Sequence, residues 1–322
     1  MDLIYTNAEK VDQGVLAAYT LDLVYGAGAG DNNFELTLGK NEPMLASGAL
    51  IYIDGTEYGG IVDGLRSSSN TQTRVSLGRT WHGILDSNII EPDSGEDYLI
   101  VSGDANDILA QLVDRLGLGD LFTVPAGASG ITVNGYSFNR YVKAYEGIRA
   151  MLSEYNAKPR IRWSGTKVEL TAELVVDYAD RPVDGDEAVL TVERHDSKVN
   201  HLICLGQGDL AGRTVLHLYV DQFGRIGETK YFTGLEERTE TYDNANAKDL
   251  KELRKEGLER FEELRGVDSV DVIVNEGSDL EYDVGDIISG TDTTTGNTAQ
   301  AVVTQKVVKI QNGAVRIDYS TQ

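Results

Sequence analysis

YDVGDIISGTDTTTGNTAQAVVTQKVVKIQNGAVRIDY, residues 282–319, is the stretch of sequence that indicates the fold of this chain. It contains two apolar runs joined at Asn312 and Gly313. An Asn-Gly pair between such runs is a strong hairpin signal, because both residues tolerate the positive φ of a type I′ turn. The polar residues 290–297 predict a loop, and alternating valines at 270–274 predict one more strand. We therefore predict a compact antiparallel β module at this end of the chain.

A helix is predicted immediately before this module, from about Asn246 to Leu264, with Gly266 near its end. Apolar residues recur on one stripe of this segment, and opposite charges lie three and four residues apart on the other face. This pattern is typical of a surface helix with one buried face. A helix that binds a partner is the alternative.

Length and composition limit what the whole chain can be. A chain of 322 residues is expected to form two or three domains. Its net charge of −23 argues against tight nucleic-acid binding, which needs clustered Lys and Arg to replace counterions on phosphate. No apolar run reaches the roughly 20 residues of a membrane span. We expect synthesis in the cytoplasm and no membrane insertion.

The remaining sequence divides into a β-rich region, a mixed region and a second β region, so the predicted fold class is α+β. Residues 1–95 contain six short strand candidates, including a turn at Asp54–Gly55 and two candidates within 71–90, which suggests a small barrel or sandwich. Residues 96–180 alternate helices and strands and predict an inserted α/β domain. Residues 181–322 form the third predicted domain, with the helix at about 246–264.

Two helices are predicted in the mixed region. Asp104 can cap the first helix, whose apolar residues recur at three and four up to Leu116, with Gly117 as the C-cap. The second is predicted over about 139–155, and a hairpin through Ser164 and Gly165 follows it.

No pattern of catalytic or metal-ligating residues stands out, so we predict no catalytic residue, no cofactor and no metal. None of the histidines shows the i, i+4 or i, i+2 spacing that brings two imidazoles to one metal; they are His82, His195, His201 and His217. Cys204 is the single cysteine and lies in an apolar strand candidate, where a thiol usually packs as a small hydrophobic group. Asp292 and its neighbours could offer oxygens to calcium, but their spacing is not that of an EF-hand.

Four segments together resemble a known family: GALIYIDGTEYGGIVDGL at 48–65, TRVSLGRTWHGILDSNII at 73–90, YDNANAKDL at 242–250, and the closing stretch with its GDIISG turn. Their order is similar to that of the siphophage Gp37-like tail proteins, which are hub proteins of phage baseplates or tail tips related to the N-terminal regions of tail-associated lysozymes. The resemblance covers nearly the whole chain. It consists of strand and turn patterns and contains no catalytic signature.

The resemblance implies an architecture and a set of partners. Residues 1–95 and 181–322 would be two tail-tube-like β-barrels, and a homotrimer would present them as a pseudo-sixfold ring that caps or continues the tail tube and lets DNA pass without binding it. The partners would be the distal tail protein, the tail tube and tape-measure proteins, and other tip or receptor-binding proteins. The expected location is the virion tail tip. Because the chain stops after its last strand, we expect no lytic activity.

The predicted contacts between subunits lie in the Thr-rich loop and on the long helix; they are Thr291, Asp292, Thr293, Thr294, Thr295, Asn297, Leu253, Leu258 and Phe261. An exposed strand edge needs a partner, and closed rotational symmetry provides one. Two other functions stay open: a cell-wall (peptidoglycan or polysaccharide) hydrolase that works through acidic residues, and a carbohydrate-binding adhesion β protein.

Overall fold

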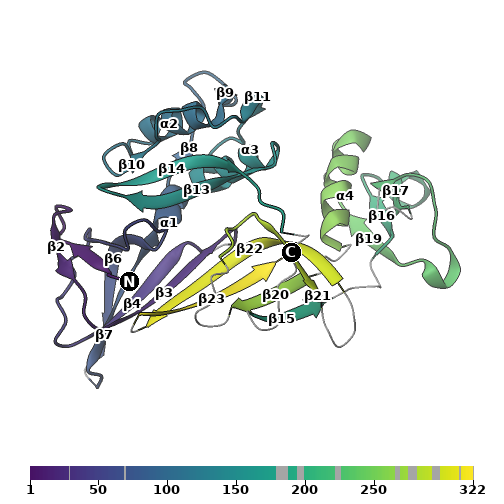
Figure 1. Ribbon diagram of the computed structural model, residues 1–322. Coiled ribbons are helices and arrows are strands. Elements are labelled where there is room, and N and C mark those ends of the chain that lie inside the picture. Colours follow the sequence, from purple (N-terminus) through teal and green to yellow (C-terminus); the bar gives the residue numbers. More distant parts are fainter. Residues whose placement is uncertain are drawn as a thin grey trace. The chain divides into compact units, whose positions relative to one another are not determined.

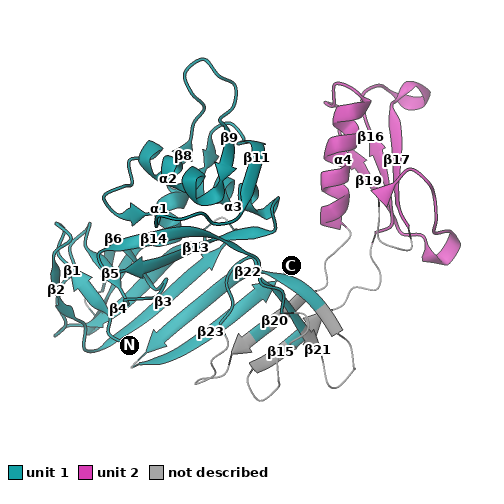
Figure 2. Cartoon of the chain, turned by 45° about the horizontal axis from the view of Figure 1, so that its top comes forward, with its two compact units in different colours: residues 1–192, 270–322 teal, residues 193–269 magenta. Residues whose placement is uncertain are grey.

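The computed structural model describes residues 1–28, 30–68, 70–178, 188–193, 199–221, 226–264, 269–274, 281–291, 298–311 and 313–321. These residues form two compact units (Figure 2). Unit 1 consists of residues 1–192 and 270–322, and unit 2 of residues 193–269. This division differs from the three predicted ranges, because the C-terminal strands pair with the N-terminal ones.

The elements of unit 1 (Figure 1) are β1 (Ile4–Thr6), β2 (Asp12–Val15), β3 (Tyr19–Gly26), β4 (Asn33–Gly39), β5 (Leu50–Tyr52), β6 (Gly59–Ser67), β7 (Thr73–Thr80), α1 (Trp81–Asp86), β8 (Ile89–Ile90), β9 (Ile100–Asp104), α2 (Ala105–Arg115), β10 (Phe122–Thr123), β11 (Thr132–Ser137), β12 (Val142–Lys143), α3 (Ala144–Ser153), β13 (Ala157–Ser164), β14 (Lys167–Leu174), β15 (Ala188–Glu193), β20 (Ser269–Val274), β21 (Ile287–Thr291), β22 (Thr298–Gln311) and β23 (Ala314–Thr321).

One large sheet is the base of unit 1. Its strand order is β15-β20-β23-β22-β3-β4-β7-β6-β5-β1-β2, and β21 pairs with β22 beside this path. In this order an N-terminal strand pairs with a C-terminal strand. β22 runs antiparallel to β3, with Gln305 opposite Gly26 and Gln311 opposite Thr20. Alternate residues of these strands form one apolar core, with Leu21, Val308 and Ile310 completely buried.

The two predicted barrels are not seen as separate closed structures. Among the described strands the large sheet is an open path, in which β15 and β2 are the two ends. The physical reason is that the closing hairpin continues the N-terminal sheet through the β22–β3 ladder. The described strands agree with the α+β class and do not close into barrels, and the arrangement as two hub barrels stays a prediction.

The closing hairpin itself is as predicted. β22 and β23 pair from Gln311 and Ala314 outward, and Gly313 has φ of +84°. The register of β22 shifts near Thr304, where a β-bulge exchanges the residues that face the core. On one side of the bulge Val303 is buried, and on the other side Lys306 is.

The middle block, residues 81–178, lies on the large sheet and contains α1, α2, α3 and the sheet β10-β14-β13 (Figure 1). Both predicted helices are present, and Asp104 caps α2 by accepting from Asn106 N. Residues 71–90 contain two strands, β7 and β8, as predicted, and the short helix α1 between them was not predicted. Thr80 starts this helix by accepting from Gly83 N.

Aromatic side chains join the middle block to the large sheet. Tyr52 on β5 stacks on Trp163 of β13 at 4.1 Å between ring centroids, and Trp81 of α1 lies 5.5 Å from the same ring. Backbone bonds add to this contact, since Trp163 N donates to Thr56 O at 2.8 Å. The middle block and the N-terminal strands therefore share one core.

Unit 2 is a four-stranded sheet covered on one face by a helix. Its elements are β16 (His201–Leu205), η1 (Leu210–Gly212), β17 (Val215–Val220), β18 (Ile226–Gly227), η2 (Gly234–Glu236), β19 (Thr239–Asp243) and α4 (Leu250–Leu264), and the strand order is β18-β17-β16-β19. Leu253 and Phe261 of α4 pack on Leu202, Cys204 and Leu218 of the sheet. The predicted helix is confirmed, with its start at Leu250. None of the described helices of the protein is both long and apolar enough to cross a membrane.

Replacing Gly257 by Ala is expected to destabilise unit 2 by about 1–2 kcal/mol, although Ala is the better helix former. Gly257 lies inside α4, where a Cβ atom would stand 2.6 Å from Cys204 Sγ. Faster labelling of the Cys204 thiol, which is completely buried in the native protein, would measure the loss. In the double variant with Cys204→Ala, circular dichroism should show most of the stability restored. The exposed Glu259→Ala is the control, and equal effects of both helix variants would contradict the contact.

Candidate functional site

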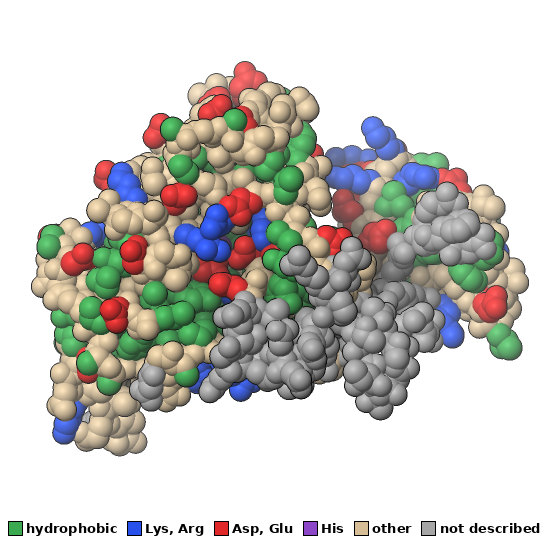
Figure 3. All heavy atoms as spheres, viewed as in Figure 1, with side chains coloured by type: hydrophobic (Ala, Val, Ile, Leu, Met, Phe, Trp, Pro, Cys, Tyr) green, Lys and Arg blue, Asp and Glu red, His purple; other side chains and the backbone are tan. Residues whose placement is uncertain are grey.

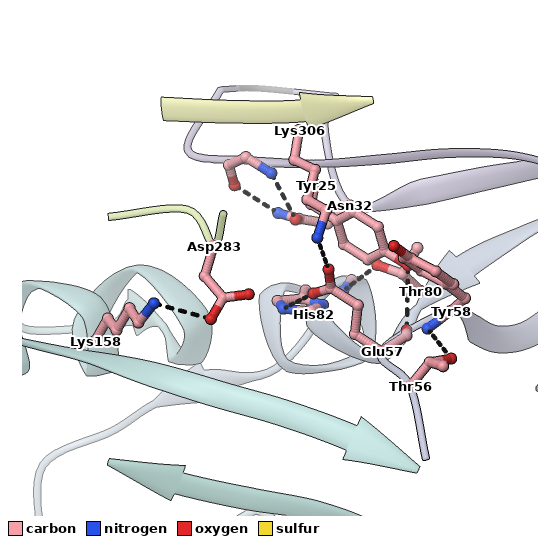
Figure 4. Close-up of polar contacts among 12 residues, drawn as sticks. Tyr25, Asn32, Thr56, Glu57, Tyr58, Thr80, His82, Lys158, Asp283 and Lys306 are labelled. Atoms are coloured by element: carbon pink, nitrogen blue, oxygen red, sulfur yellow. Dashed lines mark hydrogen bonds and ion pairs between the residues drawn. The ribbon is translucent and has the colours of Figure 1, made fainter. Parts of the chain in front are cut away.

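Six charged or titratable side chains from distant segments meet inside unit 1, and Figure 4 labels all of them except Asp286. We call them the junction cluster: Glu57 from the turn between β5 and β6, His82 from α1, Lys158 from β13, Asp283 and Asp286 from the turn before β21, and Lys306 from β22. The N-terminal strands, the middle block and the C-terminal strands each contribute. The cluster therefore lies where the three parts of unit 1 meet.

Asp286 belongs to the GDIISG turn and is 1% exposed. Its Oδ1 accepts from Lys158 Nζ at 2.7 Å and from Val176 N at 2.9 Å, and its Oδ2 accepts from Asp283 N at 2.9 Å. Lys158 is 4% exposed and also donates to Asp283 Oδ2 at 2.8 Å. The pKa of Asp283 is lowered despite its burial, because the Lys158 ammonium favours the charged carboxylate. The carboxylate of Asp286 thus connects the GDIISG turn, β13 and the segment after β14.

Lys306 is the second buried cation, at 1% exposure. Its Nζ lies 2.7 Å from Glu57 Oε1 and 3.1 Å from Glu281 Oε1 (Figure 4 shows the first pair). The rings of Tyr58 and Tyr319 lie beside the ammonium, with centroids at 5.6 and 5.9 Å. Burial raises the pKa of Glu57, and Lys306 opposes that rise. The pKa of Lys306 is raised well above its usual value although burial lowers it, because Glu57 and the neighbouring Tyr319, Tyr58 and Glu281 together outweigh the cost of burial.

His82 is buried beside this ion pair and is neutral. Its ring makes edge contacts with Tyr25 and Tyr145, and its Nε2 lies 3.8 Å from Glu57 Oε2. In the described part of the chain Nδ1 has no hydrogen-bond partner. Burial lowers the pKa of His82 to about 3.

The buried histidine gives unit 1 a pH-dependent stability. Because the folded pKa is lower than the usual value, the unfolded chain binds a proton that the folded chain does not, so stability falls as pH falls from about 6.5 toward 3. Between pH 7 and pH 5 this group alone contributes a loss of about 2 kcal/mol. His82→Gln is expected to lose less stability over that interval than the natural chain, as measured by urea unfolding followed by tryptophan fluorescence. His217→Gln, at an exposed position, should keep the natural pH dependence.

The junction cluster has little room for a ligand. A cavity of about 10 Å³ touches Glu57, His82, Tyr145 and Asp283, and a volume of this size holds about one water molecule. A glycosidase needs its two carboxylates on either side of a cleft that admits a sugar. The geometry therefore suits a role in stability better than one in catalysis.

A larger groove of about 410 Å³ opens on the surface of unit 1, between α3 and the GDIISG turn. Arg149 and Glu146 line it from α3, Val284 lines it from the turn before β21, and Ile287 and Val302 line it from β21 and β22. On the face of the protein that Figure 3 shows, acidic and basic side chains gather between the middle block and the large sheet.

The predicted contact residues are found in three settings. Thr291 ends β21 opposite Thr298, and Asp292, Thr293, Thr294, Thr295 and Asn297 lie outside the described residues. Leu253 and Phe261 are buried in the core of unit 2, and Leu258 packs against that core. The contact of these residues with a neighbouring subunit stays a prediction.

Sequence spacing missed the pairing of His201 with His217. They are 16 residues apart, but β16 and β17 are antiparallel neighbours in which Ile203 faces His217 and His201 faces Tyr219. His201 Nε2 and His217 Nδ1 are therefore 2.8 Å apart. The sequence shows only that apolar and polar residues alternate in these two strands, and this alternation does not determine which residues of one strand face which residues of the other. Cys204, by contrast, is buried as predicted, and burial raises its pKa to about 11.

The fold has clear counterparts among solved structures of phage and prophage tail proteins. A tail protein from Neisseria meningitidis MC58 matches all of this chain and 96% of its own, with a TM-score of 0.55 and 14% identity. The 43 kDa tail protein of prophage MuSo2 from Shewanella oneidensis matches 100% and 98%, with a TM-score of 0.59 and 11% identity. Prophage tail protein gp18 from Listeria monocytogenes matches 99% and 94%, with a TM-score of 0.53 and 11% identity.

No protein-family model and no curated protein matches the sequence. At identities of 11–14% the likeness is one of fold, and it extends over nearly the whole of each chain. The protein thus has the fold of phage and prophage tail proteins.

Proposed function

We propose that this chain is a structural hub protein of a phage or prophage tail tip. The observation that carries the proposal is the full-length fold match to three tail proteins, in which both units are included. The proposed hub is a homotrimer that forms a pseudo-sixfold ring on the tail tube, similar to the Gp37-like proteins and the N-terminal regions of tail-associated lysozymes. Its partners are the distal tail protein, the tube and tape-measure proteins and other tip proteins.

The charge of the chain supports a passage for DNA. With a net charge of −23 per chain, the ring would carry an excess of negative charge that repels phosphate, so DNA would pass without binding. The surface potential of an assembled ring, resolved by electron microscopy, tests this point. A basic lumen would contradict it.

We infer that the protein is not itself an enzyme. The buried carboxylates of the junction cluster adjoin a cavity of only about 10 Å³, which supports this inference for that cluster. Purified protein applied to a zymogram of bacterial cell walls is the test. Clearing of the gel would overturn the inference and favour the hydrolase.

The oligomeric state is the direct test of the hub. Light scattering on the purified chain, with negative-stain images, is expected to give three times the chain mass and ring-shaped particles. Light scattering on a mixture with the distal tail protein and tube protein of the same phage tests whether the ring forms only when a partner is present. A monomer under both conditions would contradict the hub.

A further inference from the structure

The outer face of the unit 2 sheet holds two imidazoles in a fixed arrangement. This face is the one turned away from α4, since Leu202, Cys204 and Leu218 occupy the other. His201 and His217 lie diagonally across β16 and β17, and His201 stacks on Tyr219 at 4.4 Å. Their facing nitrogens, Nε2 and Nδ1, are 2.8 Å apart.

A carboxylate orients the first imidazole. Glu237 Oε1 lies 2.8 Å from His201 Nδ1, and Thr239 Oγ1 lies 3.0 Å from the same nitrogen. Lys230 Nζ lies 2.6 Å from Glu237 Oε1, and this ion pair holds the carboxylate beside His201. The Nδ1 proton of His201 therefore points to Glu237, and the lone pair of Nε2 points to His217. Histidines that bind metal are commonly oriented by such a carboxylate on the other ring nitrogen.

The exposed ring of the pair can adapt to a metal ion. His217 is exposed, and it can offer Nδ1 once its proton lies on Nε2. Two zinc–nitrogen bonds of about 2.0–2.1 Å at a tetrahedral angle separate their nitrogens by about 3.3 Å. The ion therefore has to replace the hydrogen bond between the two nitrogens, and the exposed ring of His217 has to turn as well as move away by about half an ångström.

We propose that His201 Nε2 and His217 Nδ1 bind one divalent transition-metal ion, such as Zn²⁺, on the outer face of unit 2, with Glu237 as the positioning residue. In the described part of the chain no three His, Cys, Asp or Glu side chains converge on one point, so water completes the coordination. Imidazole nitrogen suits zinc, copper and nickel, whereas calcium and magnesium prefer oxygen. The site needs one chain only and is independent of ring formation.

Titration of the tag-free full chain with Zn²⁺ in a calorimeter tests the site. We expect one ion per chain, with the affinity reduced at least tenfold in His201→Gln and in His217→Gln. Glu237→Gln should weaken binding by about 10–100-fold. Glu240→Gln is the control and should bind as the natural chain does, because Glu240 lies on β19 opposite Leu202 and so belongs to the other face of the sheet. Affinity should also fall from pH 7.5 to pH 5.5, because protons compete for the imidazoles.

Nitrogen NMR of the imidazoles locates the ion. Zn²⁺ should shift His201 Nε2 and His217 Nδ1 and leave His82 unchanged. Unchanged labelling of the Cys204 thiol in each variant shows that unit 2 is still folded. Zinc binding that survives His217→Gln in folded protein, or the absence of both heat and NMR shifts at millimolar Zn²⁺, would overturn the proposal.

Discussion

Replacing Asp286 by Ala is expected to lower the free energy of unfolding of unit 1 by about 3–5 kcal/mol. Asp286 is buried and accepts from Lys158 Nζ and from two backbone N–H groups, Val176 N and Asp283 N. Alanine leaves both N–H donors without their acceptor and leaves Lys158 with one carboxylate partner instead of two. Asn keeps the shape but not the charge, so Asp286→Asn should lose less than Asp286→Ala.

Native probes separate this loss from events in unit 2. Both tryptophans of the chain, Trp81 and Trp163, lie in the core of unit 1, so urea unfolding followed by tryptophan fluorescence reports on that unit. Labelling of Cys204 reports on unit 2 and should be unchanged. The control is Asp318→Ala, which removes an exposed ion pair with Arg316 and should cost at most about 1 kcal/mol. If the two aspartate variants lose equal stability, the role of Asp286 is wrong.

The closing hairpin and its pairing with β3 show which parts of the fold local sequence patterns can predict. The Asn-Gly hairpin, the strands around it and the helices of the middle block follow from local periodicity and turn chemistry, and the structure contains them. The ladder between β22 and β3 does not follow, because Gln305 and Gly26 are some 280 residues apart and no local rule sets their register. That ladder decides how the strands are divided between the units.

The sequence contains a partial signal for the buried ion pair of Lys306. After the bulge near Thr304, Lys306 shares its face of β22 with Val308 and Ile310, which are completely buried. A lysine on the apolar face of a strand needs a buried counter-charge, because an unpaired buried charge is too costly. Nothing in the sequence shows that Glu57, from a turn some 250 residues earlier, supplies it. Nor does the sequence show that His201 and His217 of unit 2 are neighbours, because this depends on the register between β16 and β17.

Lys306→Met is the substitution from which we expect the second large effect, a loss of about 3–5 kcal/mol at pH 7. Methionine fills the space of the aliphatic chain but leaves Glu57 buried without its cation. Burial already raises the pKa of Glu57, and the loss of Lys306 raises it further. A carboxyl group whose folded pKa is raised contributes stability below its unfolded pKa and loses it as pH rises through the folded value. Lys306→Met should therefore be closest to the natural chain near pH 5 and furthest from it near pH 8.

The double variant Lys306→Met with Glu57→Gln distinguishes an ion pair from simple packing. If the charges stabilise each other, removing both costs less than the sum of the single losses, and a coupling energy of about 2–3 kcal/mol should appear in urea unfolding at pH 7. Lys309→Met with Asp22→Asn is the matched pair, since Lys309 and Asp22 lie 3.4 Å apart on the exposed face of the same two strands, β22 and β3. Its coupling should be below about 1 kcal/mol. Additive losses in the Lys306 and Glu57 variants would mean that the buried pair contributes volume alone, and that the three parts of unit 1 are held together by the apolar core without it.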